Sequence, residues 1–309
     1  MNALQINKYG PVSVLQIVEV EKPTIDENQV LIKVKAAAVN PIDTKIRAGY
    51  LADTTPRPFP IRLGWETAGC IEAVGENVTD LKIGDEVYTM INMVQGGGQA
   101  EYAAVDAKET ALKPASLSFD QAAAVPMAAT AAYTALSFTS EINTGQRILI
   151  HRAAGAVGAF AVQIAKKRGF YVIGTAAGEG IDLIKSLDAD EVIDYTTTDF
   201  TNVVKKVDVV LDLVGGETQL NSISLLKNGG TLITTVQLLL SPEKIEELGI
   251  RAQFVFTLSD KNILTQVTRE IDNGILKAQN PILLPFSEAQ KAHEMLETRT
   301  AKGKIVLVF

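Results

Sequence analysis

Cysteine is almost absent from this sequence of 309 residues, with Cys70 as its single member. One thiol cannot form an intrachain disulfide, and it cannot supply the three or four cysteines of a typical structural zinc site. The segment Met1–Pro11 also lacks the basic patch and apolar stretch of a secretory signal. These absences favour a reducing compartment, and we expect a cytoplasmic protein.

The sequence has no excess of positive charge and no long apolar run. Its 36 acidic residues outnumber its 29 basic ones, which gives a formal net charge of −7. Nucleic acids and membrane surfaces attract proteins through basic patches, so we expect neither as a partner. No segment approaches the roughly 18 uncharged apolar residues of a membrane-spanning helix. The 47% of hydrophobic residues is ordinary for a globular protein.

The length predicts two domains, because one domain typically takes roughly 150 residues. Residues 1–118 contain short strands separated by glycine turns, which predicts a mostly β, barrel-like domain. Residues 119–274 begin with an alanine-rich helical stretch over Phe119–Ser137 and then alternate apolar strands with helical connections, which predicts a doubly wound α/β domain. We assign residues 275–309 to the first domain. The strands expected in the second domain are Arg147–His151, Phe170–Thr175, Glu191–Asp194, Val207–Leu213, Gly230–Thr235 and Arg251–Phe256.

The turn after the first of these strands predicts phosphate binding. Gly155 and Gly158 match two glycines of a G-x-G-x-x-G pattern, whereas Ala153 stands at the first position. Such a turn directs backbone N–H groups and the positive end of a helix toward a pyrophosphate. The alternative is a glycine-containing turn that binds nothing. The cofactor-binding residues expected here are Arg152, Ala153, Ala154, Gly155, Ala156 and Val157.

The end of the second strand indicates which dinucleotide binds. Thr175 and Ala176 stand where an NAD site usually has an acidic residue for the ribose hydroxyls. The missing acid permits the 2′-phosphate of NADP(H), and Arg152 or Tyr195 is the candidate for contacting it. The alternative for Arg152 is an exposed cation that only interacts with solvent.

A series of short segments stands in a characteristic order along nearly the whole chain. They are Ala38–Asp43, Arg47–Tyr50, Leu63–Gly69, Ile83–Tyr88, Gln99–Tyr102, Ala153–Gly158, Val192–Tyr195 and Gly303–Leu307. Together they resemble the zinc-independent quinone oxidoreductase and enone reductase branch of the medium-chain dehydrogenase/reductase superfamily. The resemblance implies a GroES-like catalytic domain, completed by the C-terminal segment, beside a Rossmann domain that binds NADP(H).

The resemblance also bears on metal binding. The zinc-dependent alcohol dehydrogenases of the same superfamily carry a cysteine where this sequence has Asn40, and a His-Glu pair where it has Trp65 and Glu66. With these ligands replaced, we expect no metal site. Glu66 is then interpreted as a structural hydrogen-bond acceptor.

Without zinc, conjugated carbonyls are the expected substrates, because an enolate or hydroquinone anion is already delocalised and needs only hydrogen-bond donors. The resemblance suggests Asn40 and Tyr50 as catalytic residues. The alternatives are a turn residue before Pro41 for Asn40 and an aromatic wall for Tyr50. Asp43 and Arg47 stand four residues apart, which favours a helical ion pair.

Further residues have weaker signals. The family has a threonine near the cofactor where Thr130 stands, although a threonine within a helix also bonds back to its own carbonyls. Arg299 is a further cofactor candidate. His151 is expected to be buried and structural, and His293 to face solvent. The segment Val236–Pro242 lacks the family's usual glycine, and its three leucines are interpreted as pocket wall or dimer contact.

The leading hypothesis is an NADPH-dependent reductase of quinones or α,β-unsaturated carbonyl compounds. An NADPH-binding protein without turnover, structural or regulatory, is the alternative. A nucleic-acid-binding role is opposed by the negative charge, and a zinc alcohol dehydrogenase by the missing ligands. We expect a homodimer, because closed symmetric assemblies are the usual state of such enzymes.

Overall fold

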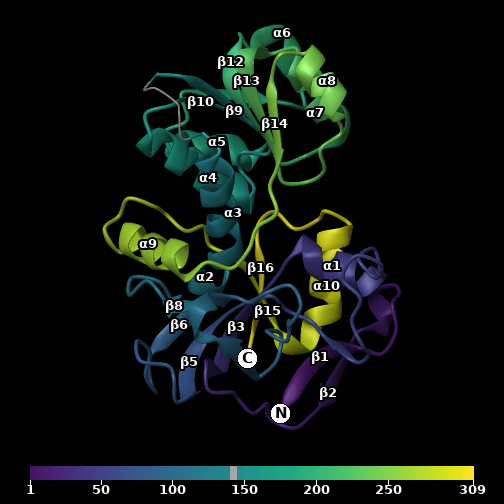
Figure 1. Ribbon diagram of the computed structural model, residues 1–309, viewed down its shortest axis with the longest axis vertical. Coiled ribbons are helices and arrows are strands. Elements are labelled where there is room, and N and C mark those ends of the chain that lie inside the picture. The colour runs from purple at the N-terminus through teal and green to yellow at the C-terminus, as the bar shows by residue number, and fades with distance from the viewer. Residues whose placement is uncertain (140–144) are drawn as a thin grey trace. The chain divides into compact units, whose positions relative to one another are not determined.

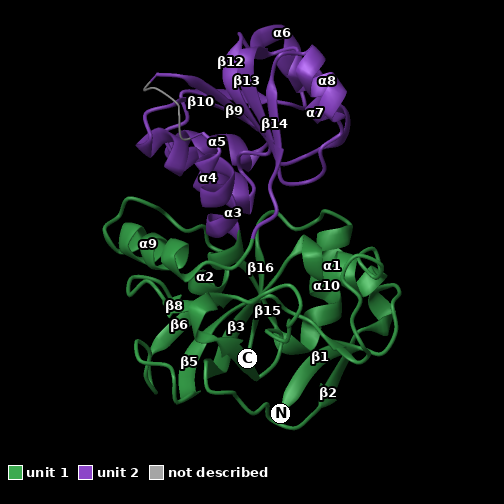
Figure 2. Ribbon diagram, in the orientation of Figure 1, with its two compact units in different colours: residues 1–127, 258–309 green, residues 128–257 purple. Residues whose placement is uncertain are grey.

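The computed structural model describes residues 1–139 and 145–309. The chain forms two compact units, and the second is a continuous stretch of sequence that interrupts the first. Residues 1–127 and 258–309 form unit 1, and residues 128–257 form unit 2 (Figure 2). These bounds differ from the expected ones because residues 119–127 and 258–274 belong to unit 1. Helix α9 (Lys261–Asp272) packs there against a strand, and its Leu264 carbonyl accepts a hydrogen bond from the Tyr88 hydroxyl at 2.8 Å.

Unit 1 is the mostly β unit that the sequence predicts, with a seven-stranded sheet and a small three-stranded sheet (Figure 1). Its central strand β3 (Gln29–Val39) pairs antiparallel with β5, β7 and β16, and register shifts near Ile32 and Ala36 interrupt its pairing with β5. The other strands are β1 (Asn2–Ile6), β2 (Gln16–Glu19), β4 (Ile61–Arg62), β5 (Glu66–Val74), β6 (Glu86–Met90), β7 (Tyr102–Asp106), β8 (Thr110–Leu112), β15 (Ile282–Pro285) and β16 (Ile305–Val308).

Helix α1 (Pro41–Ala48) of unit 1 shows why the chain turns helical directly after β3. Asn40 is its N-cap, Pro41 occupies the first turn, where its missing N–H costs nothing, and Gly49 ends the helix with φ 87°. The helical segments of unit 1 besides α1 and α9 are α2 (Phe119–Ala123), α10 (Ala289–Glu297) and the 3-10 turns η1 (Val12–Val14), η2 (Ala107–Glu109) and η3 (Phe286–Glu288).

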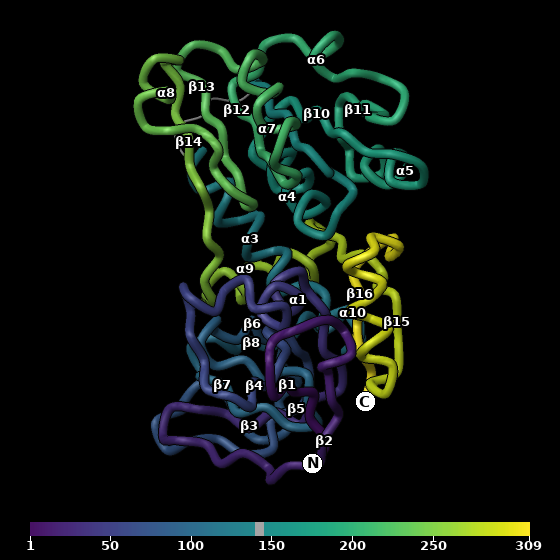
Figure 3. Tube along the Cα trace, turned by 90° about the vertical axis from the view of Figure 1, so that its right-hand side faces the viewer, coloured from purple at the N-terminus to yellow at the C-terminus, as the bar shows by residue number. Residues whose placement is uncertain are grey.

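The C-terminal segment completes unit 1. Strand β16 lies antiparallel to β3 with Ile305 opposite Val39. Figure 3 shows β15, α10 and β16 in yellow. Helix α10 packs against α1 and β16 and buries Ala289, Ala292 and His293. The expectation that His293 faces solvent is wrong: it stands four residues after Ala289, one helical turn on, and so falls on the same inner face of the helix.

Unit 2 is the expected doubly wound unit. Its six strands are all parallel, in the order β11-β10-β9-β12-β13-β14, which confirms the predicted fold. The four central strands β10, β9, β12 and β13 are mostly buried, as helices packed on a parallel sheet require, whereas the outer strands β11 and β14 are more exposed. They are β9 (Arg147–Ile150), β10 (Tyr171–Ala176), β11 (Glu191–Asp194), β12 (Val207–Asp212), β13 (Leu226–Thr234) and β14 (Arg251–Phe254).

The helices of unit 2 follow its strands. The predicted helical stretch over Phe119–Ser137 is interrupted at Pro126, which lacks an N–H and begins α3 (Pro126–Ser137). The remaining helices are α4 (Ala156–Lys167), α5 (Glu179–Ser186), α6 (Phe200–Val203), α7 (Gly216–Ile223) and α8 (Pro242–Glu247). No helix in the described part of the chain is long and apolar enough to cross a lipid bilayer.

Candidate functional site

The turn between β9 and α4 in unit 2, together with the first residues of α4, contains most of the predicted cofactor-binding residues. The N–H of Ala153 donates to the carbonyl oxygen of Thr175 at 3.0 Å, which ties the turn to β10. Helix α4 approaches this turn closely because residue 158 is glycine: a Cβ there would lie 2.3 Å from the carbonyl oxygen of Arg152. The turn therefore has the tight geometry that a close approach of backbone to a pyrophosphate needs.

Arg152 stands at the beginning of this turn with φ 53°, an uncommon conformation for a residue other than glycine. Its Nε lies 3.4 Å from the position of a Cβ at Gly155, the N-cap of α4, so the guanidinium lies beside the N-terminus of this helix. Arg152 is exposed, and its side chain has no ion-pair partner among the described residues. A cation next to the free N–H groups of a first helical turn fits a phosphate group.

The end of β10 has a structural role that the sequence did not reveal. The Thr175 hydroxyl accepts the N–H of Arg152 at 3.2 Å and lies 3.3 Å from Nδ1 of His151. Both Thr175 and Ala176 are buried. The Thr175 side chain therefore stabilises the turn, and only the backbone of this strand end is left for a ligand.

Two other predicted residues lie in unit 2 with free polar groups. Tyr195 follows β11 with 59% of its surface exposed, and its N–H donates to the Ala176 carbonyl oxygen at 3.3 Å. Thr130 in α3 is fully buried, yet its hydroxyl has no hydrogen-bond partner among the described residues. An unpartnered buried hydroxyl costs free energy, so Thr130 fits a residue that a bound molecule completes.

His151 is buried, as predicted, and links three elements. Besides its contact with Thr175 on β10, its Nε2 lies 2.8 Å from the Ser222 hydroxyl on α7. Burial lowers the pKa of His151 to about 4, although the charge of Asp212 acts in the opposite direction. His151 is therefore neutral near pH 7 and joins the ends of β9 and β10 to α7.

A second buried network, at the carboxyl end of β12, was not predicted from the sequence. Asp212, the last residue of β12, accepts the N–H groups of Val214 and Gly215 on one carboxylate oxygen, at 2.9 and 2.8 Å. Its other oxygen accepts Nε2 of Gln219 at 2.7 Å and the Thr234 hydroxyl at 2.9 Å. The pair Gly215-Gly216, both with positive φ, was the signal in the sequence for a special turn here.

Gln219 holds the segment Val236–Pro242 in place. Its Nε2 also donates to the Gln237 carbonyl oxygen at 2.7 Å, and its Oε1 accepts the Leu239 N–H at 2.8 Å. Leu238 and Leu240 are partly buried and pack against the core of unit 2, and their interpretation as pocket wall or dimer contact stays a prediction. Leu239 is the most exposed of the three, with 39% of its surface accessible.

In unit 1, Asn40 belongs to a buried triangle of polar side chains. Its Nδ2 donates to Oε2 of Glu66 at 3.0 Å, and its Oδ1 accepts a hydrogen bond from Nζ of Lys304. Lys304 also forms an ion pair with the same Glu66 oxygen at 2.7 Å. The other oxygen of Glu66 accepts the Met127 N–H at 2.8 Å, which confirms Glu66 as a structural acceptor.

Asp43 accepts a hydrogen bond from the backbone N–H of Asn40. It is fully buried and accepts three N–H groups, from the Asn40 backbone at 2.7 Å, the Gly64 backbone at 3.1 Å and the Gln99 side chain at 3.2 Å. Burial raises the pKa of Asp43 to about 7, with the backbone hydrogen bond from Asn40 and the charge of Lys304 acting against it. Asp43 therefore positions the backbone of Asn40.

The predicted ion pair between Asp43 and Arg47 is wrong. Arg47 is 1% exposed and pairs with Glu297 of α10 instead. The two residues stand one turn apart on α1, but Asp43 turns toward the backbone of Gly64 and Arg47 toward the other helix. Tertiary packing overrides the local spacing.

Two candidates lie apart from this triangle. Tyr50 follows the C-cap of α1 and is 79% exposed. Arg299 follows α10 with φ 56° and is also exposed. No hydrogen bond in the described residues joins either side chain to Asn40.

The side chains around Asn40 do not fit a zinc ion. The ammonium of Lys304 already neutralises Glu66 there, and the indole N–H of Trp65 donates to the Met93 carbonyl oxygen at 3.2 Å. Across residues 1–139 and 145–309, no three His, Cys, Asp or Glu side chains gather in a metal-binding arrangement. A zinc site needs at least three such ligands.

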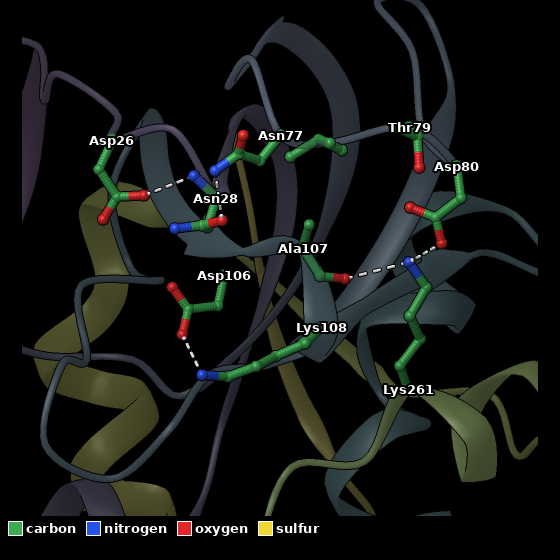
Figure 4. Close-up of a pocket in the computed structure, with 10 residues that line it drawn as sticks. Asp26, Asn28, Asn77, Thr79, Asp80, Asp106, Ala107, Lys108 and Lys261 are labelled. Atoms are coloured by element: carbon green, nitrogen blue, oxygen red, sulfur yellow. Dashed lines mark hydrogen bonds and ion pairs between the residues drawn. The ribbon is translucent and has the colours of Figure 1, made fainter.

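An open hollow of about 490 Å³ in unit 1 contains none of the predicted site residues (Figure 4). Its charges are paired internally: Lys261 with Asp80 at 2.6 Å and Lys108 with Asp106 at 3.0 Å. Both lysines are thereby neutralised, and the remaining carboxylate, Asp26, accepts the Asn28 N–H at 2.8 Å, so we assign the hollow no role.

Comparison with known proteins identifies the family. Residues 26–115 match the alcohol dehydrogenase GroES-like domain, and residues 187–307 match the family model described as zinc-binding dehydrogenase. The NADPH-dependent alkenal/one oxidoreductase of Arabidopsis thaliana chloroplasts is 37% identical over 99% of this chain and 79% of its own length.

Solved structures agree in fold over the whole chain. The quinone oxidoreductase of Coxiella burnetii superposes with a TM-score of 0.91 at 34% identity, covering 100% of this chain and 99% of that one. The Escherichia coli quinone oxidoreductase, solved in complex with NADPH, gives a TM-score of 0.89 at 29% identity with 100% of both chains covered. The chain therefore belongs to the medium-chain dehydrogenase/reductase superfamily, in its branch of quinone oxidoreductases and enone reductases.

Proposed function

We propose that this protein reduces quinones or α,β-unsaturated carbonyl compounds with NADPH and without zinc. The observation that carries the proposal is the turn at the start of α4, where the free Arg152 guanidinium lies beside Gly155 and no acid stands at the end of β10. A carboxylate there would repel a 2′-phosphate, whereas a cation attracts it. The names of the relatives, an NADPH-dependent alkenal/one oxidoreductase and a quinone oxidoreductase with NADPH, support the same cofactor and substrate class.

NADPH, when bound, supplies the hydride of the reaction. Such a hydride would leave negative charge on the carbonyl oxygen of the conjugated system, and a proton from solvent would balance it. The protein has to orient the substrate, exclude water and donate hydrogen bonds to the oxygen that becomes negative. Asn40 has one amide hydrogen beyond the one that Glu66 accepts, so it is our candidate for that donor.

The cofactor part of the proposal is tested by thermal shift with NADPH and NADH side by side. Ligand that binds only the folded state raises the melting temperature by mass action, so NADPH should give the larger shift. Arg152→Ala should weaken NADPH binding by roughly tenfold to a hundredfold and leave NADH binding nearly unchanged, because a charge-assisted hydrogen bond contributes about 1.5–3 kcal/mol.

Lys185→Ala is the matched control for Arg152→Ala. It removes the same charge from an exposed position of α5 and should leave both cofactors unaffected. Equal losses for NADPH and NADH in Arg152→Ala would contradict a 2′-phosphate contact. If neither cofactor shifts the melting temperature of the wild type, the oxidoreductase assignment has to be abandoned.

Turnover is tested by following nicotinamide absorbance with a panel of enones and quinones. Oxidation of NADPH by any of them supports the enzyme, whereas tight binding of NADPH without oxidation supports the structural or regulatory alternative. Full activity after dialysis against a chelator is expected, since the residues around Asn40 do not fit zinc.

The remaining roles are part of the same proposal. Thr130, Tyr195 and Arg299 are proposed cofactor contacts and Tyr50 a substrate contact. Their free polar groups or exposure support these roles. We also propose that the protein is a cytoplasmic homodimer. It binds no nucleic acid in this proposal, because its net charge of −7 repels the phosphate backbone.

A further inference from the structure

Lys304 is a nearly buried cation that the proposed function has not yet used. Its side chain is 11% exposed, and its Nζ lies 2.7 Å from Oε2 of Glu66, which has no exposed surface. An ion pair removed from water in this way is costly to keep, and apolar residues of similar size often replace such pairs without loss of stability. Stability alone therefore does not explain a lysine here.

Lys304 and Glu66 together determine the orientation of the Asn40 amide. An ammonium only donates hydrogen bonds and a carboxylate only accepts them. Lys304 contacts Asn40 on one side and Glu66 on the other, so the amide can satisfy both only with Oδ1 toward Lys304 and Nδ2 toward Glu66. A flipped amide would place two donors against each other and two acceptors against each other.

In this orientation Asn40 has one N–H that no group in the described part of the chain accepts and that a ligand can accept. With Oδ1 occupied by Lys304 and one Nδ2 hydrogen accepted by Glu66, the second Nδ2 hydrogen of Asn40 remains. The ammonium draws electron density toward Oδ1, which makes the remaining N–H a stronger donor. The backbone of Asn40 is held independently, because its N–H donates to Asp43 at 2.7 Å.

We propose that Lys304 is a positioning residue: it orients and polarises the Asn40 amide so that Asn40 donates a hydrogen bond to the substrate oxygen that becomes negative. This inference rests on the proposed function and deepens it. It assigns the substrate a carbonyl oxygen as its recognition group, since Asn40 in this orientation presents a donor.

The kinetic test compares Lys304→Met, which keeps the length of the side chain but removes its charge, with Lys304→Arg, which keeps the cation. Lys304→Met should lower kcat roughly tenfold to a hundredfold while the NADPH dissociation constant stays unchanged, because the lost interaction forms in the transition state. Lys304→Arg should restore at least part of kcat. Lys302→Met, an exposed neighbour on the same segment, is the matched control and should behave like the wild type.

A second variant covers the case in which Lys304→Met fails to fold, since it leaves Glu66 charged and buried. The double variant Glu66→Gln, Lys304→Met carries no unpaired charge, and the carbonyl oxygen of the introduced glutamine still offers Asn40 an acceptor. It should fold and still show the low kcat. Adding Asn40→Ala to it should cause little further loss, because the pair acts as one unit.

A spectroscopic readout separates this inference from the proposed function. In protein labelled with ¹⁵N at asparagine, the side-chain amide of Asn40 should exchange slowly with solvent in the wild type and several-fold faster in the double variant. This result is expected even if no acceptor in the panel is reduced, in which case only the proposed function fails. An Asn40 amide that is unchanged in the double variant, or a normal kcat in it, would overturn the role of Lys304.

Discussion

His293 is a titratable side chain placed where it cannot easily accept a proton. It is fully buried on α10, and neither ring nitrogen has a hydrogen-bond partner among the described residues. Burial lowers its pKa to about 3, and the nearby charge of Arg47 acts in the same direction. The unfolded chain takes up this proton near pH 6.5 and the folded chain does not. The free energy of unfolding therefore falls as the pH drops from 6.5 toward 3.

This linkage gives a prediction at the residue scale. His293→Leu should reduce the loss of unfolding free energy between pH 7.5 and pH 5 by about 2 kcal/mol, at roughly 1.4 kcal/mol per pH unit below 6.5. Urea unfolding of wild type and variant at both pH values measures it. His151, whose pKa is also lowered, remains in both proteins and serves as the internal reference. An unchanged difference between the two pH values would refute the assignment.

At this scale the sequence predicts the surroundings of a residue where its neighbours in space are also its neighbours in the chain. Arg152 and Gly158 could be assigned because the turn and the helix around them are continuous in sequence. The contact of Lys304 with Asn40 could not be foreseen, because Lys304 reaches Asn40 only when β16 pairs with β3. The local spacing of Asp43 and Arg47 even predicted a wrong pair.

At the scale of elements, α4 can lie close to the turn before it only because residue 158 is a glycine, which has no Cβ. A Cβ at residue 158 would lie 2.3 Å from the Arg152 carbonyl oxygen and 2.7 Å from the Ala153 Cα, both rigid backbone atoms. Gly158→Ala should therefore move α4 from the turn, lower the free energy of unfolding by about 1–3 kcal/mol and weaken NADPH binding. Urea unfolding and cofactor titration measure both effects.

Gly155→Ala provides the graded comparison for this prediction. A Cβ there would lie 3.2 Å from the Arg152 carbonyl oxygen and near its flexible side chain, so a small shift of Arg152 accommodates it. Its stability loss should be clearly smaller than that of Gly158→Ala. Equal losses would mean that the close approach at residue 158 has no special importance.

Strands and helices of unit 2 are predictable because their signals are local. Parallel strands covered by helices are largely apolar, and β9 to β12 lie within a residue or so of the expected ranges. Pairing in unit 1 is not local: β3 has three partner strands, two of them far along the chain, and register shifts that no spacing announces. The mostly β character was therefore predictable, and the order of strands was not.

For the whole molecule, β14 gives the expected homodimer a testable surface. It is the last strand in the sheet order of unit 2, and Phe254 and Phe256 are 40% and 54% exposed at its end. An edge strand with exposed aromatic side chains invites pairing with a second copy. Phe254→Lys should therefore shift the mass in solution from two chains toward one, as sedimentation velocity measures.

Val203→Lys is the control for this experiment. It places the same charge on another exposed apolar position of unit 2, in α6, and should leave the dimer intact. A wild type that sediments as one chain, or a Phe254→Lys variant that remains a dimer, would remove β14 as the interface.

The insertion of unit 2 into unit 1 has a consequence for biosynthesis. A ribosome makes the chain from its N-terminus, so every strand of unit 2 has been synthesised before β15 and β16. During that interval β3 lacks the strand that pairs with Ala36–Val39, Glu66 lacks the lysine that neutralises it, and the Asn40 amide oxygen lacks its hydrogen-bond donor. The nascent chain thus carries an open strand edge and an unpaired Glu66 charge until β16 has been synthesised, and an open strand edge can pair with other chains, so a chaperone that shields it is useful at this stage.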